Sequence, residues 1–174
     1  MNKIFKYFNA YKEQKKLELA YLKELNWANV YHDSIRGKKQ IEELSLNIGR
    51  WAGNYAFFYV LHTVLSKGKP TSVLELGLGE STKFISTYLK NYLPKTKHVV
   101  IEHDESWISF FNSSFELNLN SKIVHVEIKN REVKGVKTIS YVLEEQLKNE
   151  SFDLYVIDGP HGSKRFSRFD IVDF

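Results

Sequence analysis

The chain has 174 residues, of which 43% are hydrophobic and 26% are charged, as in an ordinary globular protein. This composition argues against disorder or coiled coil as a description of the whole chain, and the length suits one domain with a buried core. The net charge of +4 is a mild basic excess that permits an anionic partner but does not by itself favour nucleic acid.

The sequence contains no cysteine, which excludes disulfides and thiolate metal sites and fits a reducing compartment. No stretch reaches the roughly 20 apolar residues of a membrane span. The first residues, rich in lysine and glutamate, lack the apolar core of a signal peptide. We therefore expect a cytoplasmic protein with no membrane span.

Helical patterns dominate residues 1–68, the N-terminal helical segment. Apolar residues recur at helical spacing from about residue 3 to 28, which predicts an amphipathic helix with one apolar face. That face would consist of Ile4, Phe8, Tyr11, Leu17, Tyr21 and Leu25. Asp33, Ser34 and Gly37 predict a break.

Two further helices are predicted, at about residues 39–47 and 50–66, and the second ends before Gly68 and Pro70. The helical segment is expected to pack on the rest of the chain or to form a dimer surface, in preference to acting as a lid.

Apolar runs and helical patterns alternate from residue 69 onward. Strands are predicted at 72–76, 98–101, 122–128 and 152–157, with helices at 81–93, 106–118 and 139–148 between them. This alternation predicts an α/β domain over residues 69–174, with a Rossmann-like parallel sheet of about four strands flanked by helices and joined by right-handed crossovers.

A glycine turn follows the first predicted strand. Gly77 and Gly79 would let the backbone turn tightly and would let a ligand approach the main chain. Ser81 and Thr82 would cap the next helix and leave its free N–H groups facing the ligand. Glu75, two residues before the first glycine, adds a carboxylate to this turn.

An acid also ends the second predicted strand, where Glu102 is followed by His103 and Asp104. Glu102 lies 23 residues beyond Gly79, close to the offset of about 20 residues in nucleoside-binding α/β units. A carboxylate here accepts hydrogen bonds from both hydroxyls of a ribose. Together the turn and the acid indicate a ligand that contains adenosine.

The residues around the turn favour one adenosine ligand over others. The dinucleotide fingerprint requires a small third residue where this chain has Thr82. Glu75 would repel a pyrophosphate but suits the amino group of a methionine moiety and a cationic sulfonium. The chain has no phosphate-binding loop of the G-x-x-x-x-G-K-[ST] type.

These motifs together resemble those of class I S-adenosylmethionine-dependent methyltransferases, over about residues 70–174. Glu75-x-Gly77-x-Gly79-x-Ser81 resembles their first motif, Glu102 matches their ribose-binding acid, and residues 152–159 look like their fourth-strand motif. The resemblance implies S-adenosyl-L-methionine as the cofactor. The expected cofactor-binding residues are Glu75, Gly77, Gly79, Ser81, Thr82, Glu102, His103 and Asp158.

The loop after the fourth strand is expected to face the transferred methyl group. Asp158 and His161 are the predicted catalytic residues, and His161 is the candidate general base. Lys164, Arg165 and Arg168 form a basic cluster, which is either a solvated face or a site for an anionic substrate.

The D-G-P-x-G stretch beginning at Asp158 is similar to one in methyltransferases that act on sugars of polysaccharides, some of them metal-dependent. Asp158, His161, His103 and Asp104 do not form a dense ligand cluster, so no metal site is predicted. The sequence therefore predicts transfer of a methyl group to an oxygen or nitrogen atom of a small-molecule or carbohydrate acceptor.

Two main alternatives stay open at this point, and a third and weaker one is an RNA methyltransferase, suggested by the basic charge of the chain. The family that this chain resembles has a seven-stranded sheet when complete. The given sequence ends at Phe174, soon after the fourth predicted strand. It is therefore expected to be either a truncated form or a chain whose fourth strand, left at the sheet edge, pairs with another copy. A non-catalytic domain that dimerises or binds a partner is the first alternative, and an NAD(P)-dependent oxidoreductase is the second.

Overall fold

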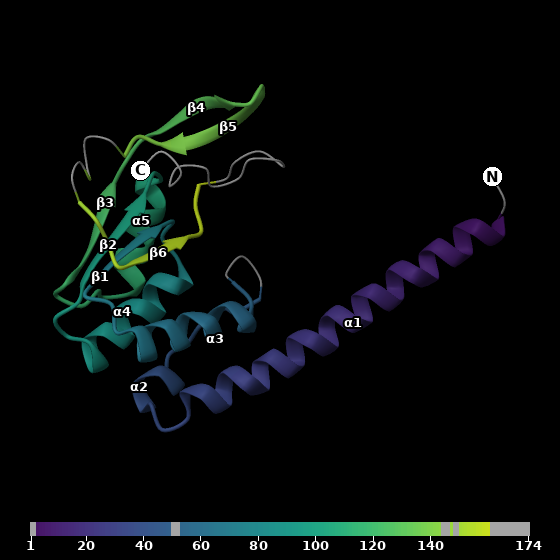
Figure 1. Cartoon of the computed structure of the whole chain (residues 1–174), viewed down its shortest axis with the longest axis horizontal. Helices are drawn as coiled ribbons and strands as arrows, with labels where there is room; N and C mark the ends of the chain where they lie inside the picture. Colours follow the sequence, from purple (N-terminus) through teal and green to yellow (C-terminus); the bar gives the residue numbers. More distant parts are fainter. Residues whose placement is uncertain (1–2, 50–52, 144–146, 148–149, 161–174) are drawn as a thin grey trace.

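The computed structural model describes residues 3–49, 53–143, 147 and 150–160. Three helices come first (Figure 1). They are α1 (Lys3–Ile35), α2 (Lys39–Glu42) and α3 (Tyr55–Thr63), and α3 continues into a π-helical turn, η1 (Val64–Gly68). The remaining elements are β1 (Ser72–Leu76), α4 (Glu80–Tyr92), β2 (Lys97–Glu102), α5 (Glu105–Ser114), β3 (Ser121–His125), β4 (Ile128–Val133), β5 (Val136–Tyr141) and β6 (Leu154–Ile157).

Four parallel strands form the main sheet, in the order β3-β2-β1-β6. Leu74 at the centre of β1 lies opposite Val99 of β2 and Tyr155 of β6. The prediction of a four-stranded parallel sheet flanked by helices is confirmed at this level, and the coarse fold is Rossmann-like. The fourth predicted strand, β6, lies at an edge of this sheet, as expected.

Val73, Leu74 and Leu76 of β1 are fully buried because both faces of the strand are covered, as is usual for a central parallel strand, and Glu75 is the one buried polar residue among them. Val73 points to one face, where it packs with Phe58 of α3 and Phe84 of α4. Val100 of β2 lies on the same face and contacts Phe111 of α5. Helices α3, α4 and α5 therefore form one layer over the sheet.

The opposite face of the sheet has a different cover. Leu74, Leu76, Val99 and Ile101 pack there against residues that follow the third strand of the sheet. These covering residues are Val126, Tyr141, Leu143, Leu147 and Phe152. The base of a hairpin and the segment after it therefore occupy the place that we expected a helix to take.

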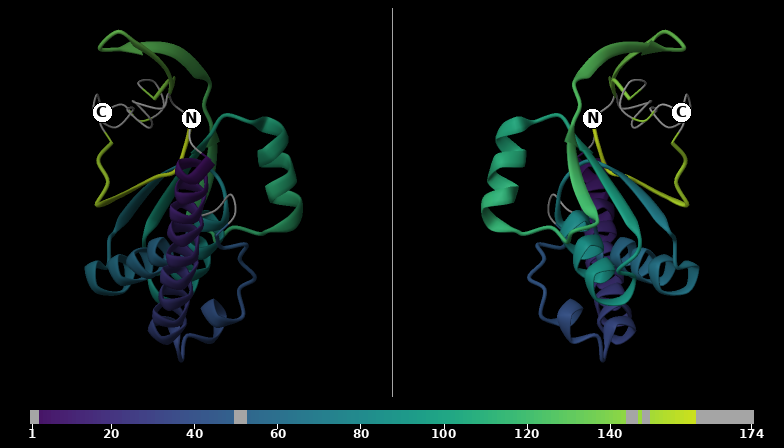
Figure 2. Two further views of the ribbon diagram at one scale, coloured as in Figure 1. Left: turned by 90° about the vertical axis from the view of Figure 1, so that its right-hand side faces the viewer. Right: turned by 90° about the vertical axis from the view of Figure 1, so that its left-hand side faces the viewer.

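The hairpin is formed by β4 and β5, which pair antiparallel and extend beyond the carboxyl ends of the parallel strands (Figures 1 and 2). The predicted helix at 139–148 is wrong at its start, because residues 139–141 belong to β5; residues 144–146 and 148–149 lie outside the described part. The predicted strand at 122–128 ends at His125, and a new strand begins at Ile128.

A two-residue turn explains the hairpin. Lys134 and Gly135 both have positive φ angles, +49° and +77°, as in the turns that match the twist of two-residue hairpins. Strand β5 consists mostly of β-branched and aromatic residues, whereas β4 is polar between Ile128 and Val133. The Lys-Gly pair before the β5 run is the sequence signal for this hairpin.

Helix α1 is longer than predicted and runs through Asp33 and Ser34 without a break. The chain turns only at Gly37, where φ is +83°. Helix α2 ends at Glu42, short of the predicted residue 47. Residues 50–52 of the third predicted helix lie outside the described part, and α3 begins at Tyr55, after the Asn54 side chain accepts a hydrogen bond from the Phe57 N–H at 2.9 Å.

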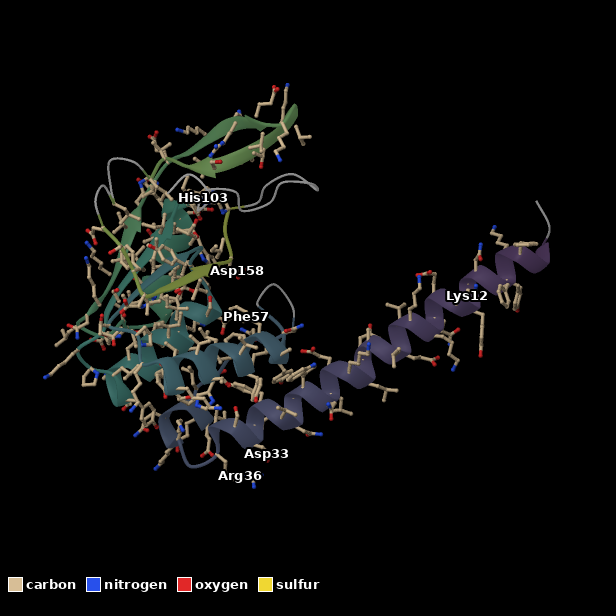
Figure 3. The ribbon with its side chains drawn as sticks, viewed as in Figure 1. Lys12, Asp33, Arg36, Phe57, His103 and Asp158 are labelled. Carbon is tan, nitrogen blue, oxygen red and sulfur yellow. The ribbon has the colours of Figure 1, made fainter. Side chains whose placement is uncertain are left out.

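The apolar face predicted for α1 does not pack on the rest of the protein. Phe8, Tyr11, Leu17, Tyr21 and Leu25 are all exposed. The N-terminal half of α1 extends away from the body, and Lys12 lies far from the sheet (Figures 1 and 3). No helix in the described residues is both long and apolar enough to cross a membrane.

Only the C-terminal part of α1 contacts the body. Trp27 packs on Tyr59 of α3 with a ring distance of 5.6 Å, and buried Tyr31 contacts Phe58 and Phe84. The Glu24 carboxylate also accepts a hydrogen bond from the Tyr55 N–H at 2.8 Å. These contacts join α1 to the helical layer and so to the sheet.

Buried His62 of α3 makes the joint with α1 sensitive to pH. Its Nδ1 lies 3.2 Å from the Ser34 hydroxyl oxygen, and burial, together with the Lys38 ammonium, lowers its pKa. Because the folded state keeps His62 neutral while the unfolded chain takes up a proton below about pH 6.5, the free energy of unfolding should fall as the pH drops through that value. Urea denaturation at pH 8 and pH 5.5 measures this loss, which should be smaller in His62→Gln; equal losses in both proteins would contradict the assignment.

Candidate functional site

The loops after β1, β2 and β6 meet at the carboxyl edge of the sheet. The Gly77 N–H donates to the Ile101 carbonyl at 2.9 Å. The N–H groups of Asp158 and Gly159 both donate to the Leu76 carbonyl, at 2.8 and 2.7 Å. Three strand ends are therefore joined by backbone hydrogen bonds at the place where open α/β sheets bind their ligands.

Gly77 lies where two backbones come very close together. Its φ is +100°, a conformation that residues with a side chain rarely adopt. A Cβ atom at Gly77 would lie 2.8 Å from the Gly159 nitrogen, and one at Gly159 would lie 2.8 Å from the Tyr141 hydroxyl oxygen. Gly77 therefore requires glycine for the fold itself, whereas a side chain at Gly159 would have to displace the Tyr141 hydroxyl.

Gly79 differs from Gly77 because it faces open space. It lies immediately before α4, and no atom would come within 4 Å of a Cβ at this position. Its N–H donates to the hydroxyl of Thr82 at 3.0 Å, and Thr82 is fully buried. Thr82 thus stabilises the turn, whereas Gly79 leaves room above it.

Glu75 lies inside the protein, on the α4 side of the sheet. One carboxylate oxygen accepts from the Ser81 hydroxyl at 2.5 Å, and the other lies 3.1 Å from Nε2 of His98. The other ring nitrogen of His98 lies 2.9 Å from the Ser121 hydroxyl. Glu75 and His98 have no exposed surface, so direct contact between Glu75 and a cofactor would require Ser81 or the turn to move.

Glu102 connects the glycine turn to the end of β2. One carboxylate oxygen accepts from the Leu78 N–H at 3.0 Å, and the other accepts from the N–H groups of His103 and Asp104 at 2.7 and 3.0 Å. Nδ1 of His103 is also 2.7 Å from this second oxygen, an ion-pair distance without the alignment of a hydrogen bond. The carboxylate is therefore fixed directly under the turn.

An open groove with a volume of about 680 Å³ lies beside Glu102, beyond the ends of β2 and β3. It is lined by His103, Asp104, Glu105, Ser106, His125, Glu127 and Ile128. Asp104 caps α5 and accepts from the Ser106 hydroxyl and the Trp107 N–H, and these bonds lower its pKa. In the described residues, no group of three or more His, Cys, Asp or Glu side chains is placed to hold a metal ion.

Two side chains at this edge, and His98 near the start of β2, have no counterpart among the predicted site residues. Nε1 of Trp107 donates to the Leu78 carbonyl at 2.8 Å, which holds the turn from the α5 side. Tyr141 packs edge-on against His103, with ring centroids 6.0 Å apart. His98 stood in an apolar run one strand away from Glu75, a pattern that signals a buried polar pair.

The predicted catalytic residues are described only in part. Asp158 is exposed at the end of β6 and lies at the same edge of the sheet as His103 (Figure 3). His161, Lys164, Arg165 and Arg168 lie outside the described residues. The structure therefore brings together Gly77, Gly79, Ser81, Glu102 and His103, with Asp158 at the same edge.

Comparison of the chain with models of protein families, with curated proteins and with solved structures gives no match. The functional argument therefore depends on the arrangement of the strands and on the geometry of this edge.

The two glycines of the turn should respond differently to substitution. Gly77→Ala should lower the free energy of unfolding by about 2 kcal/mol or more, because it combines a left-handed φ with a backbone clash. Gly79→Ala should lower it by less than about 1 kcal/mol, because its methyl group meets nothing and only the helix start changes. Denaturant unfolding of both variants measures the difference, and equal losses would show that the turn is not built as described.

Proposed function

We propose that this protein is an S-adenosylmethionine-dependent methyltransferase that acts on an oxygen or nitrogen atom of its acceptor. The observation that carries the proposal is the hydrogen bond between the Leu78 N–H and Glu102. It joins the Gly77–Gly79 turn and the start of α4 to an acidic strand end one strand away. A nucleoside with an attached amino-acid tail requires such a glycine turn and an acidic strand end lying side by side.

The residues at this edge fit such a cofactor. The open space at Gly79 gives a ligand access to the main chain, and the first N–H groups of α4 lack partners within the helix. Three backbone N–H groups use three of the roughly four lone pairs of the Glu102 carboxylate, which is 5% exposed, so one is left to accept from a ribose hydroxyl. A base attached to that ribose would enter the adjoining groove, where Asp104 and Glu127 offer acceptors for an amino group.

The surroundings of Glu75 favour a cationic ligand over a pyrophosphate. Its buried carboxylate accepts from Ser81 in the first turn of α4, directly behind the glycine turn. When it is ionised, this carboxylate opposes the attraction of the helix start for phosphate. We therefore retain S-adenosyl-L-methionine in preference to a dinucleotide.

The cofactor, when bound, would supply a methyl group on a positively charged sulfur. In the transfer the sulfur–carbon bond breaks, a bond from carbon to the acceptor atom forms, and the acceptor loses a proton. Asp158 and His161 remain our candidates for orienting the acceptor and taking up that proton. A sugar or another small molecule is the acceptor that the loop motif favours.

Calorimetric titration with S-adenosylhomocysteine tests the cofactor site. We expect the intact chain to bind and Glu102→Gln to bind at least about tenfold more weakly, because an amide replaces a carboxylate acceptor for the ribose. Glu43→Gln is the matched control, since this acid is exposed and lies outside both the turn and the groove. Gly79→Ala should also weaken binding while the unfolding midpoint stays close to that of the intact chain.

Two results would count against the proposal. Tighter binding of NADH than of S-adenosylhomocysteine would favour the oxidoreductase. A well-folded chain that binds neither ligand would favour a non-catalytic domain.

A further inference from the structure

Besides the residues that pack on the body, helix α1 presents an exposed apolar surface that is not part of the cofactor site. Along its exposed side, residues recur at alternating intervals of four and three, the spacing of a coiled-coil seam. We call this row the seam; it consists of Phe8, Tyr11, Lys15, Glu18, Leu22 and Leu25. Its apolar members are strongly exposed: Phe8 54%, Tyr11 57%, Leu22 64% and Leu25 62%.

The seam lies on the side of α1 opposite to the body. Leu22 precedes Tyr31 by nine residues, which is about two and a half helical turns, so the two side chains point in opposite directions. Glu18 stands in the same relation to Trp27. Because Trp27 and Tyr31 are the residues that pack on α3, a helix docked on the seam would not meet the body of its own chain.

We infer that the seam binds the seam of a second copy of this chain, with the two helices antiparallel. In this orientation Phe8 lies opposite Leu25 of the second copy, and Tyr11 lies opposite Leu22. Lys15 lies opposite Glu18 near the two-fold axis, so each copy contributes one member of each central ion pair. The seam is thus complementary to itself, as a two-fold interface requires.

Charge selects the antiparallel orientation over the parallel one. Parallel helices would place Lys15 beside Lys15 and Glu18 beside Glu18, which is unfavourable. Charges along the whole helix agree with this, since residues 3–16 contain five lysines and one glutamate, whereas residues 17–35 contain one lysine, two glutamates and one aspartate. An antiparallel pair sets the basic half of each helix against the acidic half of the other.

Lys15 and Glu18 already form an ion pair within one chain, which they could exchange for ion pairs with the second copy. Within one chain the Lys15 ammonium lies 2.7 Å from the Glu18 carboxylate, and both side chains are about half exposed. This contact lowers the pKa of Glu18, so the carboxylate is charged at neutral pH. Both charged groups therefore lie at the centre of the seam, where each can also form an ion pair with the opposite charge of the second copy.

Sedimentation of the full chain over a concentration series tests the interface. We expect a dimer that Lys15→Glu or Glu18→Lys each weakens at least tenfold, because each brings like charges together across the axis. The double variant Lys15→Glu with Glu18→Lys should dimerise as the original chain does. A mixture of the two single variants should form a heterodimer that is tighter than either variant's homodimer.

Glu13→Lys is the matched control, because it makes the same charge change on an exposed position of the same helix. Glu13 lies nine residues before Leu22 and therefore points away from the seam. It should leave the dimer unchanged. A chain that stays monomeric at all concentrations, or a dimer that responds equally to Glu13→Lys and Glu18→Lys, would overturn the inference.

Orientation can be measured separately, because the chain has no cysteine and one introduced thiol gives a single labelling site. Asn29→Cys places a spin label on the exposed seam side of α1. In the antiparallel dimer the two labels would be separated by about 25 residues of helical rise, or about 38 Å, whereas parallel helices would bring them within about 15 Å. The short distance would overturn the antiparallel arrangement, and circular dichroism checks that each variant keeps its helix.

Discussion

The close approach of Gly77 and Gly159 is the constraint that organises the carboxyl edge of the sheet. Because β1 lies between β2 and β6, the loop that leaves β1 runs directly beside the ends of both neighbouring strands. The absence of side chains at both glycines lets the two backbones touch, and the Leu76 carbonyl accepts from both residues that follow β6. The start of α4, the position of Glu102 and the place of Tyr141 all follow from this contact.

Much of the sheet could be predicted from sequence because each parallel strand is a short apolar run. Strand β1 matches its predicted range of 72–76, and the other three differ by a few residues at their ends. The hairpin was missed because residues 139–148 also fit a helical spacing, and the Lys-Gly turn was not weighed against it. The pairing of β4 with β5 decides between helix and hairpin, and the Lys-Gly pair is the local signal that favours the hairpin.

The candidate site, like the sheet, was predictable from the sequence only in part. Sequence order located Gly77, Gly79 and Glu102, because a strand that ends in a turn or an acid is a local pattern. The partners of Glu75 were not predictable in this way, since His98 and Ser121 come from two other strands and meet it only through the register of the sheet. Tyr141 was likewise assigned to a helix, so its position beside His103 could not be foreseen.

Helix α1 did not match the predicted single face because its apolar residues do not keep to one side: Phe8, Tyr11, Leu22 and Leu25 share one side, whereas Trp27 and Tyr31 lie on the opposite one. One further consequence concerns mechanics. The roughly 20 residues before Glu24 extend about 30 Å as a straight rod held only at its base, so a tilt of about 10° there would carry the tip about 5 Å. The rings of Trp27 and Tyr31 form the contact with α3 about which α1 would tilt. A change in their packing would therefore reorient the N-terminal half of α1 while the helix stays intact.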